Sequence, residues 1–407
     1  MEIILYLWQY IVEIFGLTIA YVFAGLFLYL VLRKFNSWKM TAILIVVFLG
    51  VSITFYMPNG MPKGLEYPMS LNTFGPSTGP VLPFANIFEF IKNFGNFERV
   101  SDIAKDPNLS LSTGVIYNSL EEAEINIVAK EVIAEMADGV TFNYWTFDGT
   151  VPGPFLKVKE GDIVNLTLTN DKTSLHHHSI DLHAVTGPGG GAAATVVEPG
   201  QSKTIKFKAL NPGIFIYHCA HPNVANHMAH GMYGLILVEP KKKMATVDKE
   251  FYIVQGEFYS SGSLGRKGLQ IFDAEAMLDG KPQYIVFNGR TGAVTKNMEA
   301  KVGDTVRIYV GNGGVNLISN FHVIGEIFDK VYREGDLISE PAKSVQTTLV
   351  PAGGAVAVEF KVDYPGNYIL VDHALSRLDR GAWGVLKVTG VADAKIFSGD
   401  IQSGMGH

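Results

Sequence analysis

The segment Gly231-Met-Tyr-Gly-Leu-Ile-Leu-Val238 returns later in the chain as Gly381-Ala-Trp-Gly-Val-Leu-Lys-Val388. In both copies a glycine turn leads into a short apolar run, which one lysine interrupts in the second copy. Such a run is typical of a buried strand. Upstream of each copy lies a second matching pair, Pro212-Gly-Ile-Phe-Ile216 and Pro365-Gly-Asn-Tyr-Ile369. Paired segments in the same order indicate an internal duplication. The sequence therefore predicts an all-β protein with two tandem sandwiches of one fold.

Composition excludes some classes of function. The chain has 407 residues, a hydrophobic fraction of 47% and a formal net charge of −6, without basic clusters. A protein of this charge is not expected to bind nucleic acid. The single cysteine, Cys219, rules out an intrachain disulfide and indicates either a reactive thiol or a metal ligand.

The N-terminus carries two long apolar runs, residues 3–32 and residues 41–57, separated by the short basic segment 33–39. Runs of this length predict two transmembrane helices, and the basic loop between them is expected on the cytoplasmic side. We therefore expect a protein of the bacterial inner membrane whose later domains face the periplasm. Glu13 lies inside the first run, and an ionisable residue there favours a functional role, for which a quinol site is one hypothesis.

Residue composition and hydrophobic periodicity divide the chain into five segments. We expect a transmembrane hairpin at 1–57 and a linker at 58–118 that contains an amphipathic helix at Phe84–Phe97. Two sandwiches follow at 119–240 and 241–392, and a C-terminal tail occupies 393–407.

Eleven histidines are present, and eight of them lie between residues 176 and 230. Among these we distinguish a first ligand set formed by His178, Cys219, His227 and Met232. Two imidazoles, a thiolate and a weak thioether are the ligands of a blue-copper electron-transfer site. Met232 alone would more often be a core residue, but its position after Cys219 and His227 favours a ligand.

A second set begins with His183 and His218. His178 and His183 lie at opposite parity on a segment expected to be a strand, so their side chains should point to different faces. The same reasoning separates His218 from the adjacent Cys219, which gives a short covalent path between two metals. In the second copy the cysteine is replaced, but His373 can supply a third imidazole.

These motifs resemble those of the copper-containing nitrite reductases over roughly residues 119–392. The resemblance rests on His178-Ser-Ile-Asp-Leu-His183, Tyr217-His-Cys-Ala220, Phe321-His-Val-Ile324 and Val371-Asp-His-Ala-Leu375. It implies cupredoxin-like Greek-key sandwiches and two coppers per subunit. The type 1 ligands would be His178, Cys219, His227 and Met232, and the type 2 ligands would be His183, His218 and His373.

The same resemblance implies an activity and partners. Nitrite would be reduced by one electron to nitric oxide and water, with Asp181 and His322 handling protons and Ile324 shaping the substrate pocket. The protein would be a homotrimer in which His373 comes from the neighbouring subunit. The electron donor would be a cytochrome c or a cupredoxin, or a quinol if the hairpin, embedded in inner-membrane lipid, takes part.

Two alternatives come from other classes. A membrane-anchored blue-copper electron carrier would need only the first ligand set and would leave three histidines unexplained. A multicopper oxidase would need several His-x-His pairs and a His-Cys-His motif, whereas this chain has His218-Cys219-Ala220. The remaining histidines fit no ligand position, and we expect them at the surface or beside the ligands: His176, His177, His221, His230 and His407.

Overall fold

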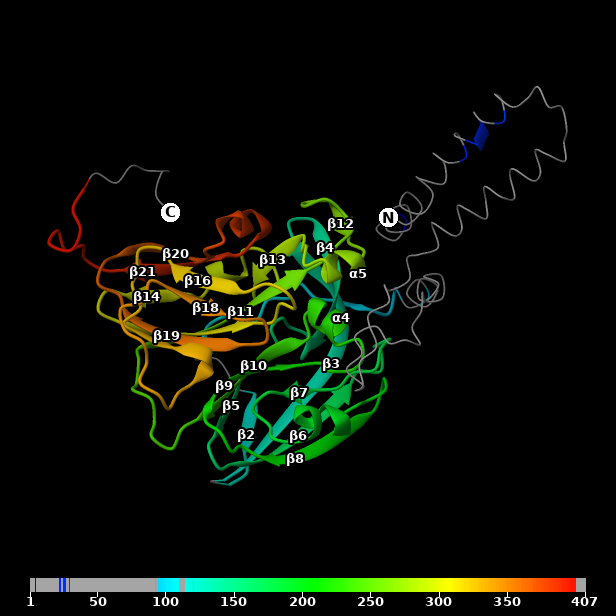
Figure 1. Cartoon of the computed structure of the whole chain (residues 1–407), viewed down its shortest axis with the longest axis horizontal. Coiled ribbons are helices and arrows are strands. Elements are labelled where there is room, and N and C mark those ends of the chain that lie inside the picture. The colour runs from blue at the N-terminus through cyan, green and yellow to red at the C-terminus, as the bar shows by residue number, and fades with distance from the viewer. Residues whose placement is uncertain are drawn as a thin grey trace.

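The computed structural model describes residues 94–109, 114–119 and 121–399, together with single positions at 4, 22, 25, 26, 29 and 92. Two β-sandwiches lie side by side in Figure 1, each made of two sheets. The predicted all-β class with two tandem sandwiches is confirmed. The domain boundaries at 119, 240 and 392 stay predictions.

The first sandwich pairs a seven-stranded sheet with a four-stranded sheet. The larger sheet is built from β1 (Glu98–Arg99), β2 (Val115–Tyr117), β3 (Glu122–Ala137), β4 (Val140–Phe147), β6 (Ile163–Asn170), β8 (Ser202–Lys208) and β12 (Gly268–Leu269). The smaller sheet is built from β5 (Leu156–Lys159), β7 (Asp181–Leu182), β9 (Gly213–His218) and β10 (Tyr233–Glu239).

The second sandwich pairs two five-stranded sheets. One contains β11 (Lys249–Phe258), β13 (Tyr284–Phe287), β15 (Thr305–Asn312), β17 (Lys330–Tyr332) and β19 (Ala355–Lys361). The other contains β14 (Glu299–Lys301), β16 (Ser319–Val323), β18 (Thr347–Val350), β20 (Gly366–Asp372) and β21 (Trp383–Thr389).

Short helices interrupt the loops. The α-helices of the described sandwiches are α4 (Val224–Ala229) and α5 (Ala274–Leu278), and the 3-10 helices are η3 (Pro188–Ala194), η4 (Ala293–Thr295), η5 (Arg333–Gly335) and η6 (Leu375–Arg380). Both α-helices begin at a side-chain cap, since Asn223 and Asp273 each accept a backbone N–H of the first turn.

Alternation of apolar and polar residues explains the sheets. Along β3, Ile125, Ile127 and Ala129 point inward and are fully or almost fully buried, while the residues between them are more exposed. A separate apolar cluster, which includes Tyr144 and Tyr252, packs the two sandwiches against each other. The hydroxyl of Tyr252 on β11 accepts a bond from the backbone N–H of Leu235 on β10 at 2.9 Å, so the second sandwich is fixed to the first beside the loop that carries Met232.

The predicted membrane location is wrong on the structural finding. Within the described residues, no helix combines the length and the apolar character needed to cross a membrane. The prediction rests on apolar length in the sequence, which does not by itself establish a membrane-spanning helix. The hairpin at 1–57, including Glu13, lies outside the described residues apart from the single positions given above, as does most of the helix expected at Phe84–Phe97.

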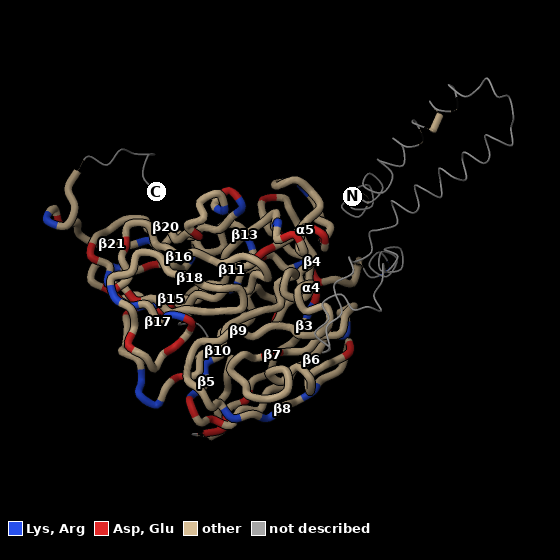
Figure 2. Tube along the Cα trace, in the orientation of Figure 1, with Lys and Arg blue, Asp and Glu red and all other residues tan. Residues whose placement is uncertain are grey.

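Charged residues of both signs are distributed over the two sandwiches. Figure 2 shows Lys and Arg interspersed with Asp and Glu along the described chain, in loops and at strand ends. In this view neither sign dominates a face of the described fold. That the chain does not bind nucleic acid stays a prediction.

Candidate metal centres

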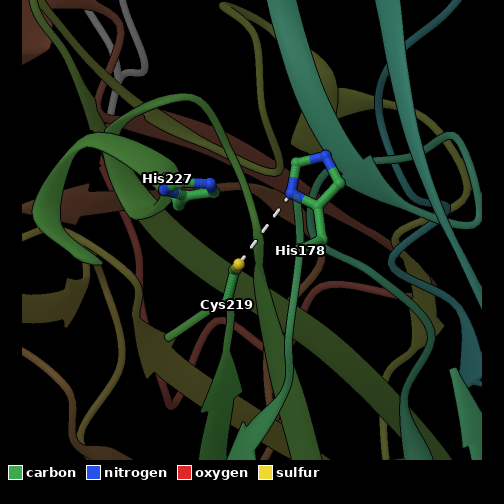
Figure 3. A group of neighbouring side chains, drawn as sticks. All are labelled: His178, Cys219 and His227. Carbon is green, nitrogen blue, oxygen red and sulfur yellow. Dashed lines mark hydrogen bonds between the residues drawn. The ribbon is translucent and has the colours of Figure 1, made fainter. Parts of the chain in front are cut away.

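Three buried side chains converge at one end of the first sandwich, as Figure 3 shows. The ligand atoms of His178, Cys219 and His227 all lie within 4.8 Å of one another. Cys219 Sγ is 3.9 Å from Nδ1 of His178. Met232 is fully buried next to this group, and its carbonyl accepts the backbone N–H of Cys219 at 3.1 Å. The structure thus brings together the first three predicted ligands and holds the fourth beside them.

Local structure explains this convergence. Strand β9 ends at His218, so Cys219 starts the loop that contains α4 and returns into β10 directly after Met232. His227 lies on α4, whose capping residue Asn223 accepts the N–H of Asn226 at 3.0 Å. His178 comes from another part of the chain and is fixed by a two-way backbone bridge to Val197.

Burial controls the charges of this group. It raises the pKa of the Cys219 thiol to about 11 and lowers the pKa of both His178 and His227. A neutral pair of imidazoles is ready to bind a cation, and the cation would displace the thiol proton. A thiolate, two imidazoles and a thioether suit copper, so the residues present fit a type 1 copper.

A second group lies on the other side of Cys219. The ligand atoms of Asp181, His183 and His218 also lie within 4.8 Å of one another. The two imidazoles point their Nε2 atoms at each other across 3.1 Å. Nδ1 of His218 donates to the carbonyl of Cys219 at 2.9 Å, which leaves its Nε2 lone pair free for a metal. Burial, together with His218, lowers the pKa of His183, which also favours a neutral ligand.

His218 and Cys219 are therefore sequence neighbours that belong to different groups. The strand expected through His178 and His183 covers only Asp181–Leu182, so the parity argument applied to a shorter element than predicted. The separation of the two ligand sets follows from the end of β9 and from a turn at His183 instead.

The remaining predicted residues lie in the second sandwich. Pairing of β16 with β20 places the His322 and His373 rings side by side, with centroids 5.2 Å apart. Nδ1 of His322 donates to the carbonyl of Gln346 at 2.6 Å, so its Nε2 is free to exchange a proton. Ile324 directly follows β16 and is half-buried. Among the described residues, neither group of converging ligands includes His322 or His373 of the same chain.

Asp181 is enclosed by a glycine segment that the sequence reasoning overlooked. Gly190 has a φ of +55°, and a Cβ on it would overlap Oδ1 of Asp181 and lie 2.8 Å from the carbonyl oxygen of Leu182. Only glycine allows this close approach. The sequence signal was the run Gly189-Gly190-Gly191 a few residues after the second ligand motif.

Two further residues beside the first group were also missed. The ring of Trp145 is stacked on His230 with centroids 4.2 Å apart and lies tilted against His176 at 4.1 Å. It meets His227 edge-on at 4.7 Å. Glu131 is fully buried, and its carboxylate contacts the loop that carries His176. Burial works to raise the pKa of Glu131, but the charge and hydrogen bond of His176, with a contribution from His178, hold it well below its usual range.

Comparison with known proteins connects this geometry to a family. Two family models described as multicopper oxidase match residues 129–243 and 269–390. The chain is 54% identical over 281 residues to the copper-containing nitrite reductase of Neisseria meningitidis serogroup A, covering 68% of this chain and 72% of that protein. It is 34% identical over 319 residues to the copper-containing nitrite reductase of Neorhizobium galegae, covering 73% of this chain and 84% of that protein.

Solved structures agree. A copper nitrite reductase from Nitrosomonas europaea superimposes with a TM-score of 0.60 at 34% identity, covering 67% of this chain and 95% of that one. A multicopper oxidase crystal structure gives a TM-score of 0.58 at 26% identity, with coverage of 70% and 95%. The similarity thus extends over both sandwiches.

Proposed function

Because this chain belongs to the copper-containing nitrite reductase family, it is an oxidoreductase that acts on nitrite with copper as its cofactor, and we propose how its own residues divide that reaction. Nitrite takes up one electron and two protons and leaves as nitric oxide and water. The residues therefore have to conduct an electron, bind the substrate and supply protons.

One observation carries the proposal. His218 and Cys219 are joined by a peptide bond, yet each belongs to a different group of converging ligands. A single covalent link thus connects an electron-accepting site to a substrate-binding site. An electron carrier has no use for the second group.

When bound, copper would supply one-electron redox chemistry at the first site and Lewis-acid binding of nitrite at the second. The first ion would be held by His178, Cys219, His227 and Met232. The second would be held by His183, His218 and, from the partner subunit, His373. Cys219 and His218 then provide the shortest covalent route between the sites.

Proton supply falls to Asp181 and His322. Asp181 Oδ2 lies 3.9 Å from the ligand atom Nε2 of His218, close enough to face a molecule bound there. His322 keeps Nδ1 bonded to Gln346 and presents Nε2, so it can hold and release a proton without leaving its position. Ile324, two residues further on, would limit the size of the pocket.

A homotrimer explains why the second site is split along the chain. His183 and His373 are both exposed in the single chain, which is unusual for metal ligands but expected at a subunit interface. Around His373, three large apolar side chains are also exposed: Ile318, Leu349 and Leu375 at 49%, 62% and 52%. Exposed apolar residues around an open ligand favour a partner surface at this position.

The electron would enter at the first site from a cytochrome c or a cupredoxin. The loop of His177 lies against His227 there, and the carbonyl of His177 is 3.2 Å from Nε2 of His227. His221 lies on the same side, with its ring 5.7 Å from that of His227. His227 is 3% exposed, whereas Cys219 and Met232 are fully buried, so a docked donor would approach the site at His227.

The test compares Asp181→Asn and His322→Ala with the wild-type protein after copper loading. Each variant should keep two coppers per chain and lose roughly 10²–10⁴-fold in nitrite turnover, since each removes a proton-handling group. Asp171→Asn is the matched control, because Asp171 precedes Asp181 on the same connection and, among the described residues, its carboxylate accepts hydrogen bonds from Thr173 of its own turn. Loss of the second copper in either variant would mean that the residue is a ligand. Four coppers per chain would favour an oxidase.

A further inference from the structure

Glu131 stands where the pattern of β3 requires an apolar residue. The inward-facing positions before and after it are Ala129 and Ile133, and Glu131 itself is fully buried. Among the ion pairs of the described residues, its partners are histidines only, His176 and His178. A buried carboxylate is costly unless its charge is used, so its position calls for an explanation.

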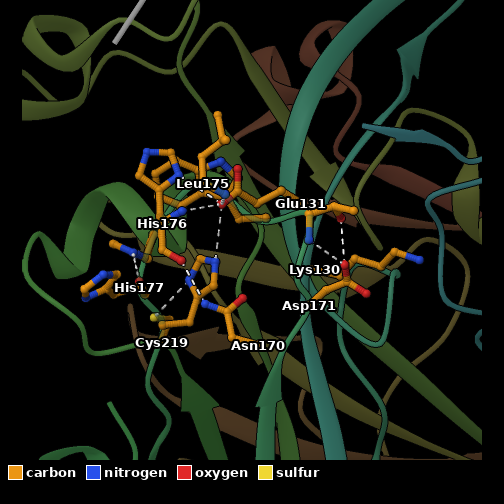
Figure 4. Close-up of polar contacts among 12 residues, drawn as sticks. Lys130, Glu131, Asn170, Asp171, Leu175, His176, His177 and Cys219 are labelled. Atoms are coloured by element: carbon orange, nitrogen blue, oxygen red, sulfur yellow. Dashed lines mark hydrogen bonds and ion pairs between the residues drawn. The ribbon is translucent and has the colours of Figure 1, made fainter. Parts of the chain in front are cut away.

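Its contacts lead directly to the type 1 site, as Figure 4 shows. Oε1 of Glu131 accepts the backbone N–H groups of Leu175 and His176 at 2.7 and 2.9 Å, and lies 3.0 Å from Nδ1 of His176. The same oxygen is 3.6 Å from Nε2 of His178. Both Nε2 of His178 and Oε2 of Glu131 are buried, and neither has a hydrogen-bond partner among the described residues.

The orientation of His178 determines whether its Nε2 carries the ring proton. Its Nδ1 faces Cys219 Sγ, so a metal at this site would bind Nδ1. A neutral imidazole has one N–H, and with Nδ1 on the metal this proton must be on Nε2. That N–H then points toward a buried carboxylate oxygen.

We propose that Glu131 is a positioning residue of the type 1 site. Its carboxylate accepts a hydrogen bond from the Nε2–H group of His178, orients the imidazole ring and lowers the reduction potential of the copper. The proposal rests on the ligand set given above. A carboxylate behind a ligand histidine makes the imidazole a stronger donor. The buried negative charge also stabilises the more positive, oxidised ion over the reduced one.

A purely structural role makes a different prediction. Glu131 also anchors the loop through two backbone N–H groups, and a glutamine at this position keeps an oxygen that can accept both. That same oxygen would still face Nε2 of His178, but the glutamine would carry no negative charge. Replacement by glutamine therefore separates loop anchoring from an effect on the metal.

The experiment is a redox titration of the intense visible absorption of the copper-loaded protein in the wild type, Glu131→Gln, Glu131→Asp and Glu135→Gln. Glu135 is the matched control, because it is a carboxylate on the same strand but exposed. In Glu131→Gln the equilibrium should shift toward reduced copper by at least roughly tenfold. This is a rise of about 59 mV in the reduction potential for a one-electron couple. Glu131→Asp should rise by less, because it keeps the charge but withdraws it from Nε2, and Glu135→Gln should not change.

Each outcome decides the proposal. A wild-type potential in a Glu131→Gln protein that retains its colour would overturn it and leave Glu131 as a loop anchor. If Glu131→Gln does not fold or take up copper, Glu131→Asp decides, and a wild-type potential there would overturn it as well. A copper-loaded wild type without the visible absorption would refute the type 1 ligand set itself, which is a separate failure.

Discussion

Replacing Gly190 by alanine tests whether the position of Asp181 matters for catalysis. The new Cβ would overlap Oδ1 of Asp181 and lie 3.0 Å from its Cγ. Asp181 would have to withdraw by about 1 Å or more to restore ordinary contact, and a displacement of that size costs roughly 100-fold in rate. This corresponds to about 2.7 kcal/mol in activation free energy.

Gly189→Ala is the matched control. Gly189 has almost the same backbone conformation, with a φ of +56°, but the nearest atom to its added Cβ is the Cβ of Ala192 at 3.5 Å. Both variants should lose about 1–2 kcal/mol of stability from the left-handed conformation. Gly190→Ala alone should also lose nitrite turnover.

The assay is steady-state nitric oxide formation at saturating nitrite, with copper content and thermal unfolding measured on the same samples. Adding Gly190→Ala to Asp181→Asn should cost little further activity, because both changes act through one carboxylate. Equal turnover in the two alanine variants, or fully additive losses in the double variant, would refute the idea that the glycine segment positions Asp181.

Three other perturbations have distinct outcomes. Cys219→Ala should abolish the intense visible absorption and donor-driven turnover but keep the type 2 copper, which metal analysis and EPR would check; surviving colour would disprove the thiolate assignment. His373→Ala should empty the type 2 site with the colour intact, and co-expression with His183→Ala should restore activity in mixed trimers; no recovery would place each site within one chain. Burial, with two neighbouring aspartates, raises the pKa of Glu326 to about 7, so its carboxyl stabilises the fold below pH 4.5 and this contribution is lost as the pH rises through 7. Glu326→Gln should therefore unfold at a higher temperature than the wild type at pH 8 and close to it at pH 5; an equal difference at both pH values would contradict this.

The tandem architecture and the convergence of ligands were predictable because both leave local marks in the sequence. The duplication is visible in paired turn-and-strand segments. The spacing from Cys219 to His227 and Met232 confines these residues to one loop, and His218 is fixed next to them by the chain itself. None of these inferences needs knowledge of long-range packing.

The supporting residues could not be predicted in the same way. Glu131 was visible as a carboxylate at an inward position, but its partner His178 is brought to it only by the fold. The contact between Gly190 and Asp181 depends on the path of η3 over β7, which no periodicity encodes. The predicted membrane location is contradicted, because no helix of the described residues is long and apolar enough to cross a membrane.

A single turnover of the reduced, copper-loaded protein with nitrite tests the central claim most directly. The type 1 absorption and nitric oxide are followed together under anaerobic conditions after all donor has been removed. If Cys219 and His218 connect the two sites, nitrite should restore the oxidised absorption, with one nitric oxide formed for each electron that leaves the protein. An absorption that stays bleached in nitrite, or that returns without nitric oxide, would contradict the claim.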